Sequence, residues 1–130
     1  MKINVVELDE SLTEDFIKFC CNELGIYPAE IQIEGWDDPF KDGALGLCYE
    51  VDCKEDYVIM VSTKDRTITE IYNTIAHEMI HVKQFMTQNL SKNLCQESKP
   101  IYGERWYEIE AGENSLNLVK KYVDNLYNTV

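Results

Sequence analysis

The chain has 130 residues, 45% of them hydrophobic, which is enough for one folded domain with its own core and too few for two. We therefore expect residues 1–130 to form a single domain. Its 24 acidic and 12 basic residues give a net charge of −12, which repels phosphate backbones and anionic lipid surfaces. Neither nucleic acid nor a membrane is an expected partner.

The N-terminal part of the chain predicts a helix followed by a strand. Ser11 precedes Glu14 by three residues, as in a capping box, and apolar side chains then recur at helical intervals up to Gly25. We expect this helix over residues 12–24. In residues 26–34, isoleucines alternate with polar side chains, a pattern typical of a half-buried strand.

The next segment predicts a loop and a hairpin. Residues 36–43 are rich in aspartate, proline and glycine, which favour turns. The runs 45–51 and 57–62 are rich in β-branched and aromatic residues, and the polar segment 52–56 separates them. The sequence therefore predicts a small antiparallel sheet of about three strands.

Two further helices complete the expected α+β fold. Thr67 and Glu70 have capping-box spacing, and apolar residues then recur every three or four positions up to Met86. Residues 88–100 are polar and predict an irregular connection. The periodic segment 104–127 predicts the last helix, with Gly112 as a weak point.

The helix after Thr67 carries the only two histidines in the chain. His77 and His81 are four residues apart, so both imidazoles project from one face and can bind a single metal ion. Glu78 is rotated by about 100° around the helix axis, which suits a general base beside a metal-activated water. The alternative is that both histidines are ordinary helix residues.

A catalytic zinc ion usually takes three protein ligands and leaves the fourth position to water. The chain has no third histidine, so the remaining ligand must be a carboxylate or a cysteine. The five cysteines have no C-x-x-C spacing and fit reduced, partly buried thiols better than ligands. The sequence shows no signal peptide and no apolar run of about 20 residues, so we expect a soluble cytoplasmic protein.

Two blocks of the sequence resemble the gluzincin family of zinc peptidases, and in particular its minigluzincin and SprT-like forms. The first block is His77-Glu78-Met79-Ile80-His81-Val82-Lys83-Gln84, and the second is Trp106-Tyr107-Glu108-Ile109-Glu110-Ala111. The resemblance implies a minimal zincin-like domain that hydrolyses peptide bonds. It also implies that Zn²⁺ is held by His77, His81 and Glu108, and that Glu78 takes a proton from the attacking water.

The second block leaves two questions open. Glu110 is a reserve ligand, because Glu108 and Glu110 lie about 200° apart on a helix and only one can face the metal. Gly112 stands where the family has an aspartate that orients a metal-binding histidine, and Asn73, one turn before His77, is a weak substitute.

The resemblance also implies how a peptide or protein substrate binds. In this family an extended substrate pairs with the edge strand beside the metal helix, which we expect at Tyr57–Val61. Candidates for stabilising the oxyanion are Tyr102, Arg105 and Tyr107. The sequence does not predict the oligomeric state.

Other functions are compatible with the same motif. A non-catalytic zinc-binding interaction module would use the same ligands to hold a structural ion. A DNA-associated protease, as some SprT-like proteins are, would need a basic surface that this acidic chain lacks. An interaction module with a coincidental motif would bind no zinc.

Overall fold

Three helices and four strands form the part of the chain that the computed structural model describes, namely residues 1–38, 40, 43–51, 55–88, 90 and 105–128. In chain order the elements are β1 (Lys2–Val6), α1 (Glu10–Leu24), β2 (Glu30–Trp36), β3 (Gly46–Val51), β4 (Asp56–Ser62), α2 (Ile68–Thr87) and α4 (Trp106–Asn128). The expected α+β fold is confirmed. The expected connection at 88–100 falls mostly outside the described residues.

The sheet is larger than expected, and it is mixed rather than antiparallel. Its strand order is β1-β2-β4-β3, with β1 parallel to β2 and β2 parallel to β4. The expected hairpin is confirmed, since β3 pairs antiparallel with β4. The prediction of about three antiparallel strands is wrong because β1 adds a strand, and because β2 and β4 are joined through β3, a connection that returns β4 parallel to β2.

This strand order corrects the expected edge strand. The run Tyr57–Val61 lies inside β4, which is paired with β2 on one side and with β3 on the other. Its backbone is therefore engaged on both sides. Among the described strands, the edge on the metal-helix side is β3, which packs against α2.

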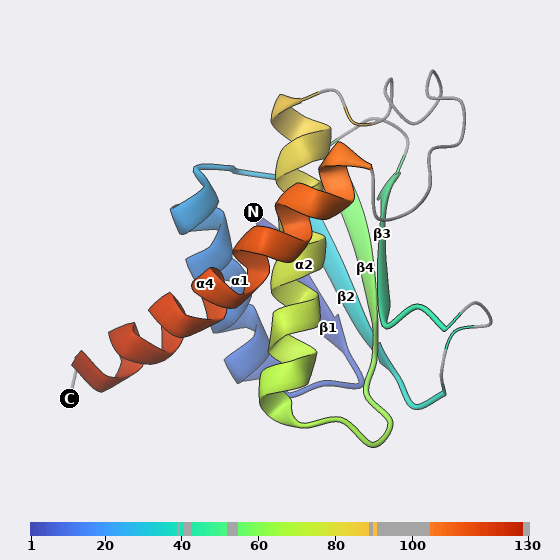
Figure 1. The fold of residues 1–130 in the computed structure, drawn as a ribbon, viewed down its shortest axis with the longest axis vertical. Coiled ribbons are helices and arrows are strands. Elements are labelled where there is room, and N and C mark those ends of the chain that lie inside the picture. The colour runs from blue at the N-terminus through green and yellow to red at the C-terminus, as the bar shows by residue number, and fades with distance from the viewer. Residues whose placement is uncertain (39, 41–42, 52–54, 89, 91–104, 129–130) are drawn as a thin grey trace.

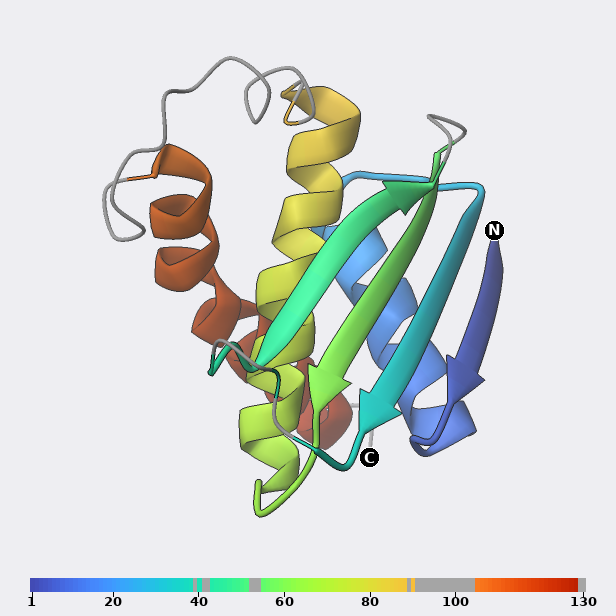
Figure 2. The ribbon, with the colours of Figure 1, turned by 90° about the vertical axis from the view of Figure 1, so that its right-hand side faces the viewer.

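The helices cover one face of the sheet in two layers. α1 packs against β1, and α2 packs against β3 and β4, while α4 crosses the outside of α2 (Figure 1). Viewed from the side, the sheet lies in front of α1 and α2, and α4 lies to the left of α2 (Figure 2). The contact between α2 and α4 is the more extensive of the two that α4 makes with helices, and it brings together the two blocks that carry the zinc-peptidase resemblance.

The helix ends follow from local chemistry. α2 begins with the expected capping box, in which the Thr67 hydroxyl accepts a hydrogen bond from the Glu70 N–H and the Glu70 carboxylate accepts one from the Thr67 N–H. α1 is capped by Asp9, whose carboxylate accepts from the Leu12 N–H at 2.8 Å, so the expected cap at Ser11 is two residues too late. Gly25 ends α1 in the left-handed conformation, at φ 68°.

The core lies between the sheet and the first helical layer. Strands β2 and β4 alternate between buried and half-buried residues, as expected for a sheet with one covered face. Phe16 of α1 stacks on Tyr72 of α2 with ring centroids 4.6 Å apart, which joins the two inner helices. Within the described residues, no helix combines the length and the apolar composition needed to cross a membrane.

Candidate metal centre

The helix α2 buries one face in the core and turns another toward α4. Ile75, Ala76 and Met79 are fully buried, which fixes the rotation of the helix about its axis. His77 and His81 then lie one turn apart on the side that meets α4. Their side chains are 23% and 11% exposed, so both are reachable from a surface cleft without being free in solvent.

Glu108, in the first turn of α4, meets both histidines. One carboxylate oxygen, Oε1, lies 3.3 Å from Nε2 of His77 and 2.5 Å from Nε2 of His81. One ligand atom from each of the three residues lies within 4.8 Å of the others. The structure thus brings together the three side chains that the sequence analysis selects as ligands.

This donor set fits a zinc ion. Two imidazole nitrogens and one carboxylate oxygen are a ligand set of catalytic zinc, with bonds of about 2.0–2.2 Å, which separates tetrahedral donors by roughly 3.4 Å. The distance between His77 and Glu108 already matches that separation. The direct hydrogen bond between His81 and Glu108 is the contact that a metal ion would replace.

Glu110, the reserve ligand, takes a different position from Glu108. Its Oε1 accepts a hydrogen bond from Nε2 of Gln84 at 3.0 Å, and the three-residue cluster of possible ligands does not include it. This outcome follows from helix geometry, because Glu110 lies about 200° around α4 from Glu108.

Gln84 is a site residue whose contact with His81 the sequence analysis does not predict. It is fully buried, and its Oε1 lies 2.7 Å from Nδ1 of His81. Its Nε2 donates to the backbone oxygen of Tyr107 at 2.9 Å as well as to Glu110. The available signal was the glutamine three residues after His81, a spacing that places both side chains on the same side of the helix.

Burial and neighbouring charges shift the pKa values of Glu78 and His81. Burial of Glu78, which is only 5% exposed, raises the pKa of its carboxyl to about 7, although the two histidines oppose the shift. Burial alone would lower the pKa of His81, but its hydrogen bond with Glu108 and the charge of Glu78 outweigh that effect and raise it. In the metal-free centre, Glu78 and His81 therefore keep their protons to higher pH than they would in solvent.

A cleft of about 750 Å³ opens onto the centre. His77, Glu78, His81 and Glu108 belong to its polar part, together with Asn73 and Thr74. Much of the remaining wall is apolar, from Leu45, Leu47, Phe85, Leu90 and Tyr107. The cleft has the size of a ligand site and places apolar surface next to the candidate metal ligands.

Cys48 also lines the cleft but is not one of the three residues whose ligand atoms lie close together. Burial, together with the carboxylates of Glu78 and Glu50, raises the pKa of its thiol well above the usual value. The thiol is therefore neutral in the metal-free protein. Cys20 and Cys21 are buried and free, as expected of ordinary thiols, and Cys53 and Cys95 lie outside the described residues.

Of the remaining candidates from the sequence, some line the cleft and others do not. Asn73 lines the cleft, and its buried Oδ1 has no hydrogen-bond partner within the described residues, so it is not seen to orient His77. A Cβ at Gly112 would meet no atom within 4 Å. Tyr107 lines the cleft and Arg105 does not appear in its wall, while Tyr102 lies outside the described residues.

Comparison of the chain with protein families, with curated proteins and with solved structures gives no match. The function therefore has to be argued from the geometry and chemistry of the site.

Proposed function

We propose that this protein is a zinc-dependent hydrolase. The observation that carries the proposal is the convergence of His77, His81 and Glu108 at the end of an open cleft, with a buried carboxylate beside them. A structural zinc site is usually closed by four protein ligands, whereas a catalytic one keeps a position for water. Three ligands facing a cleft favour the catalytic kind.

Within that class we propose a metallopeptidase of the gluzincin type. The sequence resemblance supplies this narrower assignment, and three features of the site support it: both histidines on one helix, the glutamate ligand on the next, and Glu78 between the histidines. These are the positions that the resemblance assigns to ligands and base.

The chain's own residues divide the work as follows. When bound, zinc supplies a Lewis acid that polarises the peptide carbonyl and lowers the pKa of a coordinated water to about 7. Glu78 accepts the proton of the attacking water and delivers it to the departing amine. Its buried position beside both histidines holds its carboxylate near the reacting atoms and away from bulk solvent.

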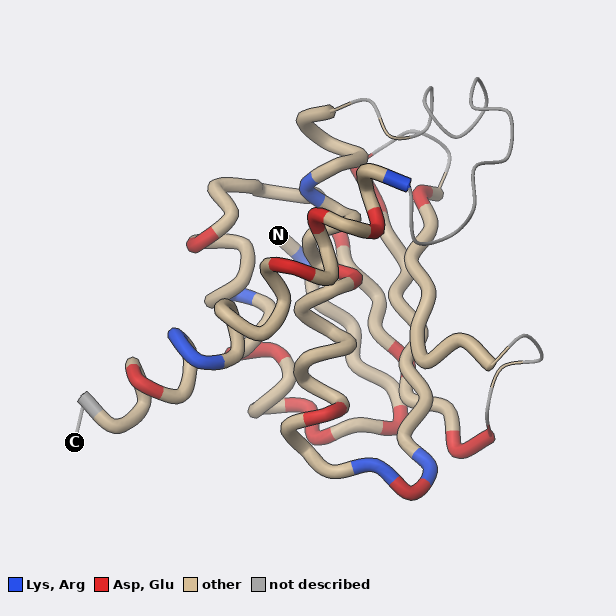
Figure 3. The backbone as a smooth tube through the Cα atoms, in the orientation of Figure 1, with Lys and Arg blue, Asp and Glu red and all other residues tan. Residues whose placement is uncertain are grey.

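The substrate we propose is an extended peptide or an unfolded segment of a protein. The edge strand β3 runs along the cleft, since Gly46, Leu47 and Cys48 line it, and a peptide added beside β3 would pair through its main chain. The apolar wall suits an apolar side chain next to the bond that is cut. The basic residues within the described part of the chain are scattered and gather on no one element in Figure 3, which also favours a peptide over nucleic acid.

The test is the substitution Glu78→Gln, which keeps the size of the side chain but removes its basic oxygen. Purified protein loaded with one equivalent of zinc is incubated with unfolded casein, and new amino termini are counted. We expect the variant to bind zinc and to lose peptidase activity by at least about a hundredfold, in the range of general-base catalysis.

Glu113→Gln, on the exposed side of α4, is the matched control and should keep full activity. If Glu78→Gln is as active as the wild type, Glu78 is not the general base. Zinc bound without any cleavage by the wild type would favour the non-catalytic zinc module instead.

A further inference from the structure

The site contains a buried side chain whose orientation is determined by its neighbours. Gln84 has two N–H donors and one carbonyl acceptor at the end of its side chain. Both donors are used, one on the Tyr107 carbonyl and one on the Glu110 carboxylate. Neither partner can donate a hydrogen bond. Rotating the amide by 180° would therefore place its oxygen beside two other acceptors, with no hydrogen between them.

This orientation fixes the proton on His81. Because the amide oxygen of Gln84 must face His81, the atom that meets it, Nδ1, has to carry a hydrogen and donate. The second ring nitrogen, Nε2, then points toward Glu108 and is the one available to a metal. A histidine in the opposite tautomer would present a proton where the metal has to bind.

We infer that Glu110 is a positioning residue for the proposed zinc centre, and that it acts through Gln84 on His81. The role toward zinc rests on the proposed function, whereas the hydrogen bonds that link Glu110, Gln84 and His81 do not. Glu110 supplies one of the two acceptors that orient Gln84. Its negative charge also strengthens the chain of hydrogen bonds that ends at the metal ligand.

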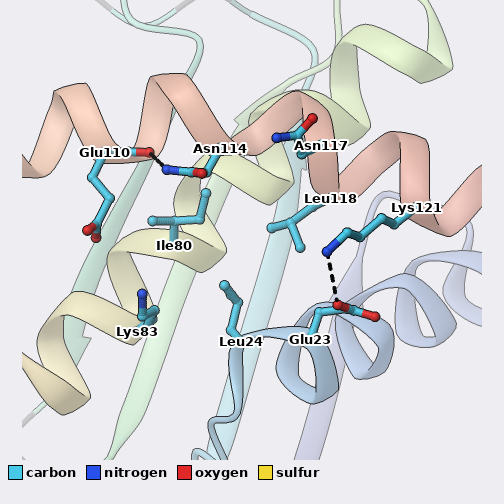
Figure 4. A pocket seen from close by; sticks show the side chains of 9 residues that line it. All are labelled: Glu23, Leu24, Ile80, Lys83, Glu110, Asn114, Asn117, Leu118 and Lys121. Carbon is cyan, nitrogen blue, oxygen red and sulfur yellow. Dashed lines mark hydrogen bonds and ion pairs between the residues drawn. The ribbon is translucent and has the colours of Figure 1, made fainter.

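The far end of this chain lies at the surface. Glu110 lines a second cavity of about 230 Å³, on the opposite side of α4 from Glu108, together with Lys83 of α2 and residues of α1. In Figure 4 the Glu110 carboxylate projects from α4 toward α2, beside Ile80 and above Lys83. The metal ligand is thus connected to a surface cavity by only two side chains.

The experiment measures zinc affinity and the proton on His81 separately. Zinc affinity is measured by competition with a chromophoric chelator for the wild type, Glu110→Ala, Glu110→Gln and Glu113→Ala. We expect Glu110→Ala to bind zinc about tenfold more weakly, the lower end of the range for such supporting groups, because the Tyr107 carbonyl still holds Gln84. Glu110→Gln keeps an acceptor without the charge and should fall between, whereas Glu113→Ala should match the wild type.

The second measurement uses protein labelled with ¹⁵N in its two histidines. NMR of the wild type should show a hydrogen on Nδ1 of His81 that exchanges slowly with water, both without metal and with zinc. In Glu110→Ala this hydrogen should exchange faster, which a purely structural role of Glu110 would not predict in a variant with unchanged circular dichroism.

Two results would overturn the inference. One is an NMR spectrum of the wild-type protein in which Nδ1 of His81 carries no hydrogen. This measurement does not depend on whether any variant folds. The other is a Glu110→Ala variant with the zinc affinity and exchange rate of Glu113→Ala. The metal-free NMR spectrum needs neither zinc nor substrate. It therefore tests the hydrogen on Nδ1 of His81 even if the protein proves not to be a peptidase.

Discussion

Gly46, the first residue of β3, lies so close to Thr74 of α2 that a Cβ on the glycine would stand 2.6 Å from the methyl carbon of Thr74. The same Cβ would lie 3.4 Å from Cγ of Glu78. The absence of a side chain at Gly46 thus sets the spacing between the edge strand and the helix that carries the centre.

The first prediction follows from this contact. Gly46→Ala should lower the free energy of unfolding by about 1–3 kcal/mol, since the added methyl group overlaps Thr74 and also presses on the Met60 carbonyl. Urea denaturation measures the change. Restoring stability with the double variant Gly46→Ala, Thr74→Ser, which removes the Thr74 methyl, would show that the clash is the cause, and an unaltered midpoint for Gly46→Ala would contradict it.

Gly112 should respond in the opposite direction. It lies in the middle of α4, and a Cβ there would meet nothing within 4 Å. Gly112→Ala should therefore raise the free energy of unfolding by about 0.5–1 kcal/mol through the better helix propensity of alanine. A fall in thermal midpoint would mean that the glycine has a role that the contacts do not reveal.

Gly112→Asp tests the incomplete part of the zinc-peptidase resemblance. Aspartate at this position is what the family pattern has, and the open space at Gly112 admits it. If the carboxylate reaches His77, zinc should bind more tightly than in Gly112→Ala, by up to about tenfold. Equal affinities of the two variants, measured by chelator competition, would show that this chain does not use the position.

The identity of the third ligand can be tested by metal content. Wild-type protein purified without chelator should hold about one zinc ion per chain, and Glu108→Ala should lose most of it, because two histidines remain. Glu110→Ala should keep most of its zinc, because all three ligands remain. Elemental analysis after dialysis decides between them, and a reversed pattern would move the ligand to Glu110.

The metal-free protein should be more stable at mildly acidic pH. The carboxyl of Glu78 has a pKa of about 7 in the folded state, above its ordinary value of 4.5, so folding favours its protonated form. That contribution is present at low pH and is lost as the pH rises through 7. It amounts to about 2 kcal/mol between pH 5.5 and pH 8.

Urea denaturation of chelator-treated protein at the two pH values measures this effect. Glu78→Gln should show a smaller loss of stability with rising pH than the wild type does. The raised pKa of His81 acts in the same direction and remains in the variant. If the two proteins lose the same stability, burial of Glu78 does not set the pH dependence.

Local signals in the sequence were enough to predict the helices and the hairpin. The capping box of Thr67 and Glu70 depends on residues three apart, and β3 and β4 are neighbours in the chain. β1 was not predicted, because Lys2–Val6 is short and is held by a parallel pairing with residues about 28 positions away. A second nonlocal pairing, between β2 and β4, makes β4 an interior strand, which no local pattern indicates.

The candidate site was predictable where it depends on one helix and less so where two helices meet. The spacing of His77 and His81 follows from α2 alone. The choice between Glu108 and Glu110 depends on how α4 is rotated against α2, which the sequence analysis left open. The contacts of Gln84 with Tyr107 and Glu110 cross between the helices, so they appear only in the structure.

The position of Glu108 has a consequence for how the proposed zinc ion would enter the site. One carboxylate oxygen contacts histidines on a separate helix, so the three side chains already join α2 to α4 through protons alone. Under the proposed function, zinc would compete with protons for the same donor atoms. We therefore expect the metal-free chain to fold with α2 and α4 already packed together, so that binding of zinc would exchange it for protons.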